Sequence, residues 1–392
     1  MFRMAVGHSD DIDVERALDA VLEECDAALK GATPRAGLLL ASWASDSQAQ
    51  IDRVRGRYPG IELAGATAAG EMSSVLGFSE DSVALALFAS DAVDVVAGMG
   101  RDLAGDPIGA IRRAVDDARG KSDLPPSLCI AMSTIGPVDA SLILETLRDA
   151  LGPDVPILGG GAAPRDPAAN PTSTVGAGRL IAGDVVCEDA IAILLFCGPL
   201  ALSYGVHTGW RGVGPRALVT GVSPDSVTEI DGRPAIEFYE RYLGTAEPAI
   251  ANPLAVFDGQ GSDRFYLRTP LAYDQATGCV TFFGGVPDGS SVQLTVAATD
   301  EIFEGARESI ADALRNFPAG RTPEAALIFS CATRRYLLGT RAGREIEVVR
   351  DALALGTPVA GVYCLGEIAP MVAGDPSQFH NATLVSILLG SG

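Results

Sequence analysis

Three serine hydroxyls follow apolar runs that are typical of buried strands, at Ser42, Ser133 and Ser330. In α/β sheets, ligands usually occupy the crevice beyond the carboxyl ends of the strands, where a hydroxyl or a helix N-terminus suits a carboxylate or another anion. Glycines and other small residues end three further runs and let main-chain amides approach a ligand. The candidates at strand ends are Ser42, Gly65, Thr67, Ser133, Gly159, Gly160, Ser330, Gly361 and Tyr363. Each alone is better explained by a helix cap or a turn, but together, with Arg334 beside them, they predict a small polar ligand.

Arg334 is a cation close to one of these strand ends, shortly after Cys331. We expect its guanidinium to clamp a ligand carboxylate in a two-pronged geometry that lysine could not copy, in a pocket between the N- and C-terminal halves. The alternative is that Arg334 only pairs with an acid of this acidic chain. A hypothesis of a different class is an enzyme with Cys331 or Ser330 as nucleophile, because neighbouring arginines could lower the pKa of Cys331. His380 is the one histidine downstream that could serve as its base.

The usual catalytic and metal-binding motifs are missing from the sequence. It contains no GxSxG elbow, HExxH helix or GxxxxGK[ST] loop, and the run 159–161 lacks the lysine of a phosphate loop. The three histidines, His8, His207 and His380, are far apart and form no HxH or HxxxH pair. We therefore assign no catalytic residue and no metal site.

Two glutamates and a His-Asn pair are candidates for fixing loops as well as for contacting a ligand. Glu71 and Glu367 each follow a glycine, and each carboxylate is predicted to accept main-chain amides rather than to act as an acid or base. His380 and Asn381 directly precede the last predicted strand. His380 is expected to donate a ring N–H to the Glu367 loop, and Asn381 to bond the main chain at the start of that strand.

The elements that carry these residues recur three times along the chain, at 4–88, 95–196 and 294–389. Each copy has a strand, a helix, a strand ending in serine, a second helix, a glycine-rich strand end and a final apolar strand. Apolar periodicity predicts the helices at 13–30, 46–57, 106–119, 139–151, 301–316 and 343–355. Gly65, Gly70 and Glu71 correspond without a gap to Gly361, Gly366 and Glu367, and Gly65 also corresponds to Gly159. Equivalent positions are therefore predicted to superpose.

A different segment, 199–290, separates the second and third copies. Turn pairs and short apolar strands indicate an antiparallel β insertion with one helix, Ala235 to Leu243. The predicted fold is therefore α/β, with layered mixed sheets built from three related βαβαββ-type units and a β-rich insertion. We expect one domain at 1–198, with two units, and a second at 199–392, with the insertion and the third unit at 291–392.

Composition limits the possible functions. Of the 392 residues, 47% are hydrophobic and 20% are charged, which excludes a disordered chain. A formal net charge of −21 disfavours binding to nucleic acid or to an anionic membrane surface. The first residues contain no apolar signal core, and the longest apolar run, 190–197, is too short for a membrane helix. Seven scattered cysteines without a CxxC pair are typical of a reducing compartment. We expect a soluble, cytoplasmic protein.

The motifs resemble those of the FIST family, whose paired FIST N and FIST C sensory domains occur in bacterial signalling proteins. The N-terminal half is similar to FIST N through the stretches 63–71 and 156–162, and the C-terminal half to FIST C through 227–235 and 329–334. The most specific signatures are Gly-Glu-Ile-Ala-Pro at 366–370 and Phe-His-Asn-Ala-Thr at 379–383. The resemblance covers nearly the entire chain.

This resemblance implies a cytoplasmic sensory module for a small ligand, with amino acids as the usual proposal. Nothing in the sequence encodes a kinase or cyclase output, so the module is expected to act in signal transduction through a separate partner, such as a kinase or a cyclic-di-GMP enzyme. Some relatives bind haem and sense nitric oxide. The alternative is therefore a haem sensor, with His380 as the first ligand candidate and His8 or His207 behind it.

Overall fold

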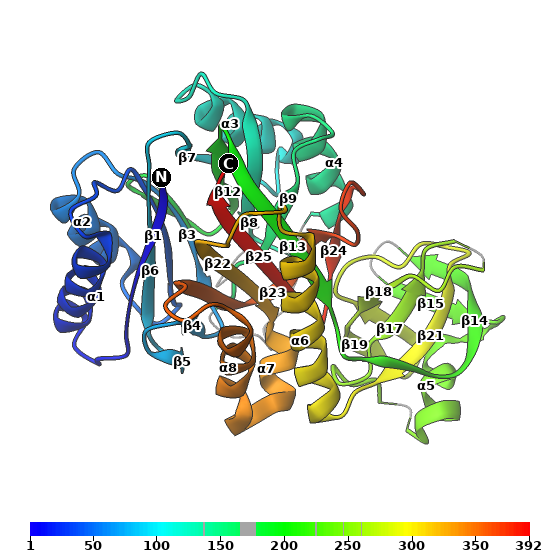
Figure 1. The fold of residues 1–392 in the computed structure, drawn as a ribbon. Coiled ribbons are helices and arrows are strands. Elements are labelled where there is room, and N and C mark those ends of the chain that lie inside the picture. Colours follow the sequence, from blue (N-terminus) through cyan, green and yellow to red (C-terminus); the bar gives the residue numbers. More distant parts are fainter. Residues whose placement is uncertain (136–137, 165–177, 224–225, 246, 260) are drawn as a thin grey trace.

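The computed structural model describes residues 1–135, 138–164, 178–223, 226–245, 247–259 and 261–392. A six-stranded and an eleven-stranded mixed sheet, with helices packed on them, form an α/β body. An eight-stranded sheet forms a separate β-rich lobe beside the body (Figure 1). The predicted class, layered α/β with mixed sheets, is confirmed.

The first unit consists of β1 (Phe2–Ser9), α1 (Val14–Leu29), β2 (Ala36–Ser42), α2 (Ser47–Arg57), β3 (Glu62–Ala68) and β6 (Val83–Ser90). Its strands lie in the order β1-β6-β2-β3, with β6 antiparallel to both neighbours and β2 parallel to β3. The two helices begin where the carboxylates of Asp13 and Asp46 accept the first free amides. Both helices follow the predicted ranges to within one residue.

The second unit repeats this order with β7 (Asp94–Arg101), α3 (Pro107–Arg119), β8 (Pro126–Ser133), α4 (Ala140–Leu151), β9 (Ile157–Gly161) and β12 (Ala190–Cys197). The strand order is β7-β12-β8-β9, with the same parallel and antiparallel pairings. Asp106 and Asp139 cap α3 and α4 in the same way. The apolar run at 190–197 forms β12, a central strand whose residues are all buried. A strand covered on both faces has no polar side, which explains why the run is continuously apolar.

The third unit has β13 (Leu200–His207), α6 (Thr299–Asn316), β22 (Ala325–Cys331), α7 (Ala332–Leu338), a 3-10 turn (Gly339–Arg341), α8 (Gly343–Ala352), β23 (Val359–Pro370) and β25 (Leu384–Ser391). Its order, β13-β25-β22-β23, matches the other two units. One prediction was wrong: the run 294–296 is not the first strand of this unit but part of β21 (Ser291–Val296) in the lobe. The lobe interrupts the unit after its first strand, and short apolar runs on either side of an insertion look alike in sequence.

The glycines that the sequence aligns have the same role in each unit. Gly65, Gly159 and Gly361 lie directly opposite a residue of the neighbouring parallel strand. A Cβ atom at Gly65 would lie 2.0 Å from the carbonyl oxygen of Leu39, and one at Gly159 would lie 2.0 Å from that of Ala131. At Gly361 the corresponding distance, to Ile328, is 2.8 Å. The glycines therefore allow close strand contact, and the predicted correspondence between units is confirmed.

The units are joined by a cyclic exchange of strands. The hairpin of β4 (Glu71–Ser73) and β5 (Gly77–Ser79) follows the third strand of unit one and pairs with β23 of unit three. The hairpin of β10 (Leu180–Ala182) and β11 (Val185–Cys187), from unit two, pairs with β3 of unit one. The second half of β23 extends from unit three onto β9 of unit two, where it also pairs with β24 (Ser377–His380). Each unit thus completes the sheet of a neighbour.

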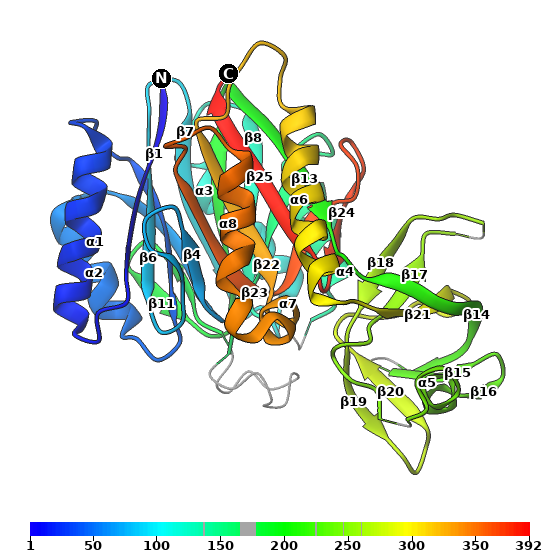
Figure 2. The same cartoon turned by 60° about the horizontal axis from the view of Figure 1, so that its bottom comes forward.

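The inner sheet faces of all three units share one apolar core, which includes Phe88, Phe196 and Phe329. The helices cover the outer faces with separate cores: α1 and α2 on unit one, α3 and α4 on unit two, and α6 to α8 on unit three (Figures 1 and 2). This layering explains the continuous apolar strands, since a strand that is covered on both faces has no polar side.

The lobe contains β14 (Arg211–Ser223), β15 (Ser226–Ile230), β16 (Arg233–Pro234), β17 (Leu254–Phe257), β18 (Phe265–Arg268), β19 (Pro270–Asp274), β20 (Cys279–Phe282) and β21. Its helix, α5 (Ala235–Leu243), has the predicted bounds. Figure 2 shows the lobe beside the end of the body near α4 and β24. Within the described ranges, none of the helices has the length and apolar character required to span a bilayer.

Candidate functional site

The predicted residues at the strand ends do not share one cavity. Ser42 lines two cavities, one within unit one and one that also reaches Pro164 and Arg335, and donates to Asp81 Oδ1 at 2.8 Å. Thr67 and Ser133 are buried, and the Thr67 hydroxyl donates to the carbonyl oxygen of Ala163 at 2.7 Å. Gly160 pairs with Glu367 across the junction of units two and three. Thr67 and Gly160 therefore join neighbouring units, whereas Ser42 is bonded within unit one, and the contact of all these residues with a ligand stays a prediction.

Glu71 and Glu367 occupy equivalent places and fix the start of the last strand of their units. Oε2 of Glu71 accepts from the amide of Ser82 at 3.3 Å and from its hydroxyl at 2.5 Å. Oε2 of Glu367 accepts from the amide of Thr383 at 3.1 Å and from its hydroxyl at 2.7 Å. Both side chains are fully buried, and burial raises the pKa of each to about 8. The predicted acceptance of main-chain amides is confirmed, but near neutral pH burial favours the protonated form of both groups.

Arg334 is fully buried and bonded within the protein. Its Nε and Nη2 atoms lie 2.9 and 2.7 Å from Oε1 of Glu345, and further donors reach main-chain carbonyl oxygens, including that of Ile302 at 2.8 Å. Ser330 donates to Oε2 of the same glutamate at 2.6 Å. Tyr363, also fully buried, donates its hydroxyl to the carbonyl oxygen of Ala342. The structure therefore places Arg334 in an internal ion pair, the alternative that the sequence left open, and a clamp on a ligand would require this pair to open.

Cys331 lies at the end of β22, directly opposite Cys364 of β23. Burial, together with the nearby Glu367, raises the pKa of the Cys331 thiol to about 12. A nucleophilic cysteine requires the opposite shift, because the thiolate is the reactive form. The environment of Cys331 therefore does not activate it.

The three histidines have partners inside the protein. The ring nitrogens of His8 lie 2.8 Å from the hydroxyls of Ser73 and Ser82, and burial lowers the pKa of His8 to about 4. His207 lies between two carboxylates, Glu308 and Asp312. No histidine lines the two cavities at Ser42, the cavity beside Arg350 of α8 or the cavity between α4 and the lobe, and the described residues contain no cluster of three or more metal-ligating side chains. These surroundings do not fit haem.

His380 and Asn381 connect the C-terminal hairpin to its surroundings. Nε2 of His380 lies 2.9 Å from the carbonyl oxygen of Ala369, in the segment after Glu367, as predicted. Oδ1 of Asn381 accepts from the amide of Thr269 at 2.8 Å. Because Thr269 belongs to the lobe, Asn381 fixes the lobe to the body rather than only the start of the strand.

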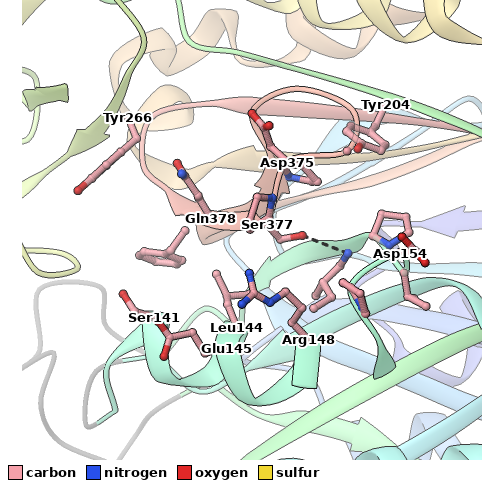
Figure 3. Close-up of a pocket in the computed structure, with 18 of the residues that line it drawn as sticks. Ser141, Leu144, Glu145, Arg148, Asp154, Tyr204, Tyr266, Asp375, Ser377 and Gln378 are labelled. Atoms are coloured by element: carbon pink, nitrogen blue, oxygen red, sulfur yellow. Dashed lines mark hydrogen bonds between the residues drawn. The ribbon is translucent and has the colours of Figure 1, made fainter. Parts of the chain in front are cut away.

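The strongest candidate site is a cavity of about 480 Å³ between α4 of unit two, the C-terminal hairpin of unit three and the lobe, which we call the junction cavity. Figure 3 shows Ser141, Glu145 and Arg148 of α4 on one side, and Ser377 and Gln378 of β24 on the other. Tyr266 of β18, Tyr204 of β13 and Phe379 complete the wall. Aromatic walls with a few charged groups are typical of small-molecule sites. Like the predicted pocket, this cavity lies between the N- and C-terminal halves, but none of the predicted residues lines it, and the predicted ligand site stays a prediction.

Arg268 is the most unusual residue of this wall. Only 7% of the residue is exposed, and its three hydrogen bonds, to Gly285, Leu267 and Phe379, all go to main-chain carbonyl oxygens. Its guanidinium lies 4.2 Å from the ring centre of Tyr266. Burial lowers the pKa of Arg268 to about 10, so it stays charged at neutral pH. None of the described carboxylates forms an ion pair with it, whereas buried charges in proteins are usually paired.

The face of α4 adds charges of both signs to the junction cavity. Ser141, Glu145 and Arg148 lie about one turn apart on the same side of the helix. The sequence does not mark these residues as a site, because their periodicity is that of an ordinary solvent face. It does not mark Arg268 either, since the chain gives no local sign that β18 meets the C-terminal hairpin. Phe379 belongs to the family motif at 379–383, which does not indicate a cavity.

These features define a three-unit α/β protein with a β-rich lobe and a cavity where the lobe meets the body. Sequence comparison identifies a FIST N domain at residues 35–233 and a FIST C domain at residues 235–370. The chain therefore belongs to the FIST family, whose domains are sensory domains of signal transduction.

Among known proteins, the chain is similar to an uncharacterized protein of Mycobacterium tuberculosis strain H37Rv, Rv0628c, with 32% identity over 194 residues, or 45% of this chain and 47% of that protein. The uncharacterized protein Mb0898c of Mycobacterium bovis is 26% identical over 192 residues, or 46% of this chain and 48% of that protein. The chain thus spans about half the length of the curated relatives it matches. A crystal structure of cyanuric acid hydrolase from A. caulinodans aligns over 100% of this chain and 99% of that one, at 10% identity and a TM-score of 0.37. So low a score supports no conclusion about function.

Proposed function

We propose that this protein is a sensory module that binds a small carboxylate, in the first instance an amino acid, in the junction cavity. The observation that carries the proposal is Arg268, a buried cation on the cavity wall without a carboxylate partner among the described residues. Leaving a charge buried and unpaired is costly, and an anionic ligand would remove that cost. The three hydrogen bonds of Arg268 use its Nε and Nη1 atoms, so the two N–H groups of Nη2 are the donors left for a ligand carboxylate.

The other residues of the cavity support a ligand that also carries a positive charge. Glu145 and Arg148 lie within one turn of each other on α4, so a ligand amine and a ligand carboxylate would each meet a group of opposite sign. The rings of Tyr266 and Phe379 offer apolar surface to a side chain. An amino acid has this combination of charges on a small skeleton, whereas a dianion such as phosphate would be repelled by Glu145.

Binding at this place would affect how the two FIST domains contact each other. The cavity is bounded by α4, which lies in the FIST N match, by β18, which lies in the FIST C match, and by the C-terminal hairpin, which follows that match. A ligand that contacts both α4 and β18 would stabilise the arrangement in which these elements lie close together. A separate signalling protein would bind the two arrangements with different affinity.

Isothermal titration of the whole chain with a panel of amino acids, other small carboxylates and phosphate tests this proposal. We expect an amino acid to bind, and Arg268→Met to weaken its binding by at least about tenfold. Arg233→Met removes an exposed arginine of the same lobe and is the matched control, with unchanged affinity expected. If Arg268→Met does not fold, Arg148→Ala on the open helix face takes its place. A parent protein that binds none of the panel, or folded variants that bind as tightly as the parent, would refute the proposal.

A further inference from the structure

A second cavity, of about 250 Å³, lies wholly within unit one and shares no residue with the junction cavity. It is bounded by the ends of β1 and β2 and by the first turns of α1 and α2, with Ser9, Val14 and Ser45 in its wall. We call it the unit-one cavity. Its volume is below the ~300–1,000 Å³ of sites for drug-sized ligands, so it suits a molecule of about one ring.

Gln50 of α2 lines this cavity without forming the hydrogen bonds that its burial requires. The residue is 1% exposed, and its Oε1 atom has no partner among the described residues. One turn earlier on the same helix face, the buried hydroxyl of Ser47 also lacks a partner. A buried polar group left unsatisfied costs about 1–3 kcal/mol, and such groups in native proteins normally meet water or a ligand.

The other polar groups of the wall are already used within the protein. Ser42 donates to Asp81 at 2.8 Å, and the hydroxyl of Ser45 donates to the carbonyl oxygen of Ser42 at 2.6 Å. The hydroxyl of Ser82 is shared between Glu71 and His8. The carboxamide of Gln50, which offers an acceptor beside a donor, is therefore the group with capacity for a ligand.

The remaining wall restricts the chemistry of that ligand. Ile12, Val14, Ala17 and Val83 provide an apolar surface. The carboxylates of Asp11 and Asp81 also line the cavity, in a chain with a net charge of −21, so an anionic ligand is disfavoured. The cavity thus combines an apolar wall, two carboxylates and one carboxamide.

We propose that the unit-one cavity is a second ligand site, which binds a small uncharged ring compound with a hydrogen-bond donor next to an acceptor. Carboxamides, lactams and free nucleobases have this edge, and glutamine pairs with such an edge through two hydrogen bonds in protein–DNA complexes. The same cavity excludes a nucleotide, whose phosphates would meet the acidic surroundings. The site does not depend on the junction cavity.

Saturation-transfer NMR and isothermal titration with uracil, adenine and nicotinamide as probes test this inference on the whole chain. We expect at least one probe to bind, and Gln50→Leu to weaken its binding by tenfold or more. Gln48→Leu is the matched control, because Gln48 is an exposed glutamine of the same helix that donates to Asp52. Arg268→Met should leave probe binding unchanged, which separates this inference from the proposed function.

Thermal unfolding of the same variants without a probe measures whether Gln50 stabilises the fold, independently of ligand binding. Gln50→Leu replaces an unsatisfied buried carboxamide by an apolar side chain of similar size, so its unfolding midpoint should not fall. A fall of several degrees would mean that Gln50 is bonded inside the fold, and would overturn the inference. So would a parent protein that binds none of the three probes, or a Gln50→Leu variant that binds as the parent does. If Gln50→Leu does not fold, Ala44→Phe at the exposed rim should block the cavity and weaken probe binding equally.

Discussion

The two equivalent glutamates should make the stability of this protein depend on pH in a predictable direction. Glu71 and Glu367 are fully buried, and burial raises the pKa of each from 4.5 to about 8. At about 1.36 kcal/mol per pKa unit, this shift corresponds to roughly 5 kcal/mol per group as an upper bound. Replacement of either residue by glutamine removes the ionisation but keeps an oxygen that accepts from Ser82 or Thr383.

The sign follows from which state holds the proton. Between pH 4.5 and 8 the unfolded chain has released the proton of each glutamate, while the folded protein still holds it. The free energy of unfolding of the parent should therefore fall as the pH rises through this window. At pH 5 we expect Glu367→Gln to cost no more than about 1 kcal/mol. Above pH 8 it should be more stable than the parent by a few kcal/mol.

Urea denaturation of the parent, Glu71→Gln and Glu367→Gln at pH 5, 7 and 9 measures this effect. The difference between parent and variant removes the general pH dependence that comes from the net charge of −21. Glu23→Gln, at an exposed position of α1, is the control and should give a difference that is small at every pH. A difference for Glu367→Gln that stays constant from pH 5 to 9 would refute the reasoning, because it would mean that the buried carboxyl has an ordinary pKa.

Three further predictions concern buried groups. Arg334→Met or Glu345→Gln alone should lower the free energy of unfolding by about 3–5 kcal/mol, because each leaves one buried charge without its partner. The apolar double variant Arg334→Met/Glu345→Leu should lose much less free energy of unfolding in the same urea titration. Additive losses would contradict the pairing. Gly366→Ala should lower the free energy of unfolding by about 2–4 kcal/mol, since φ is +71° and a Cβ would lie 2.2 Å from the ring of Phe379. Gly356→Ala, where φ is +86° but a Cβ would meet open space, should lower it by only about 1 kcal/mol. Iodoacetamide at pH 8 should label Cys331 slowly in the folded protein and rapidly in urea, because burial raises the pKa of the thiol to about 12. Mass spectrometry measures the labelling. Rapid labelling of the folded protein would restore the nucleophile hypothesis.

Much of the fold could be predicted from local pattern. Helices such as α1 and α4 are amphipathic over their whole length, and each begins at an aspartate, so their ranges follow from periodicity and capping. The correspondence of Gly65 with Gly361 reflects the same close strand contact in two copies of one unit. The first strand of unit three was missed because the lobe separates β13 from the rest of its sheet, and pairing between distant strands leaves no local signal.

The candidate site depended on tertiary structure. Arg334 and Arg268 both lie at or next to the end of an apolar strand, and the sequence favoured Arg334. In the folded protein Arg334 forms an ion pair with Glu345, which already balances its charge. Arg268 instead donates to main-chain carbonyl oxygens and lies near the ring of Phe379, a residue more than 100 positions later in the sequence. The repeat, most of the elements and the family resemblance follow from the sequence alone. Only the tertiary structure shows which arginine has no counter-ion among the described residues, because the charge balance of a buried group depends on residues brought together from distant parts of the chain.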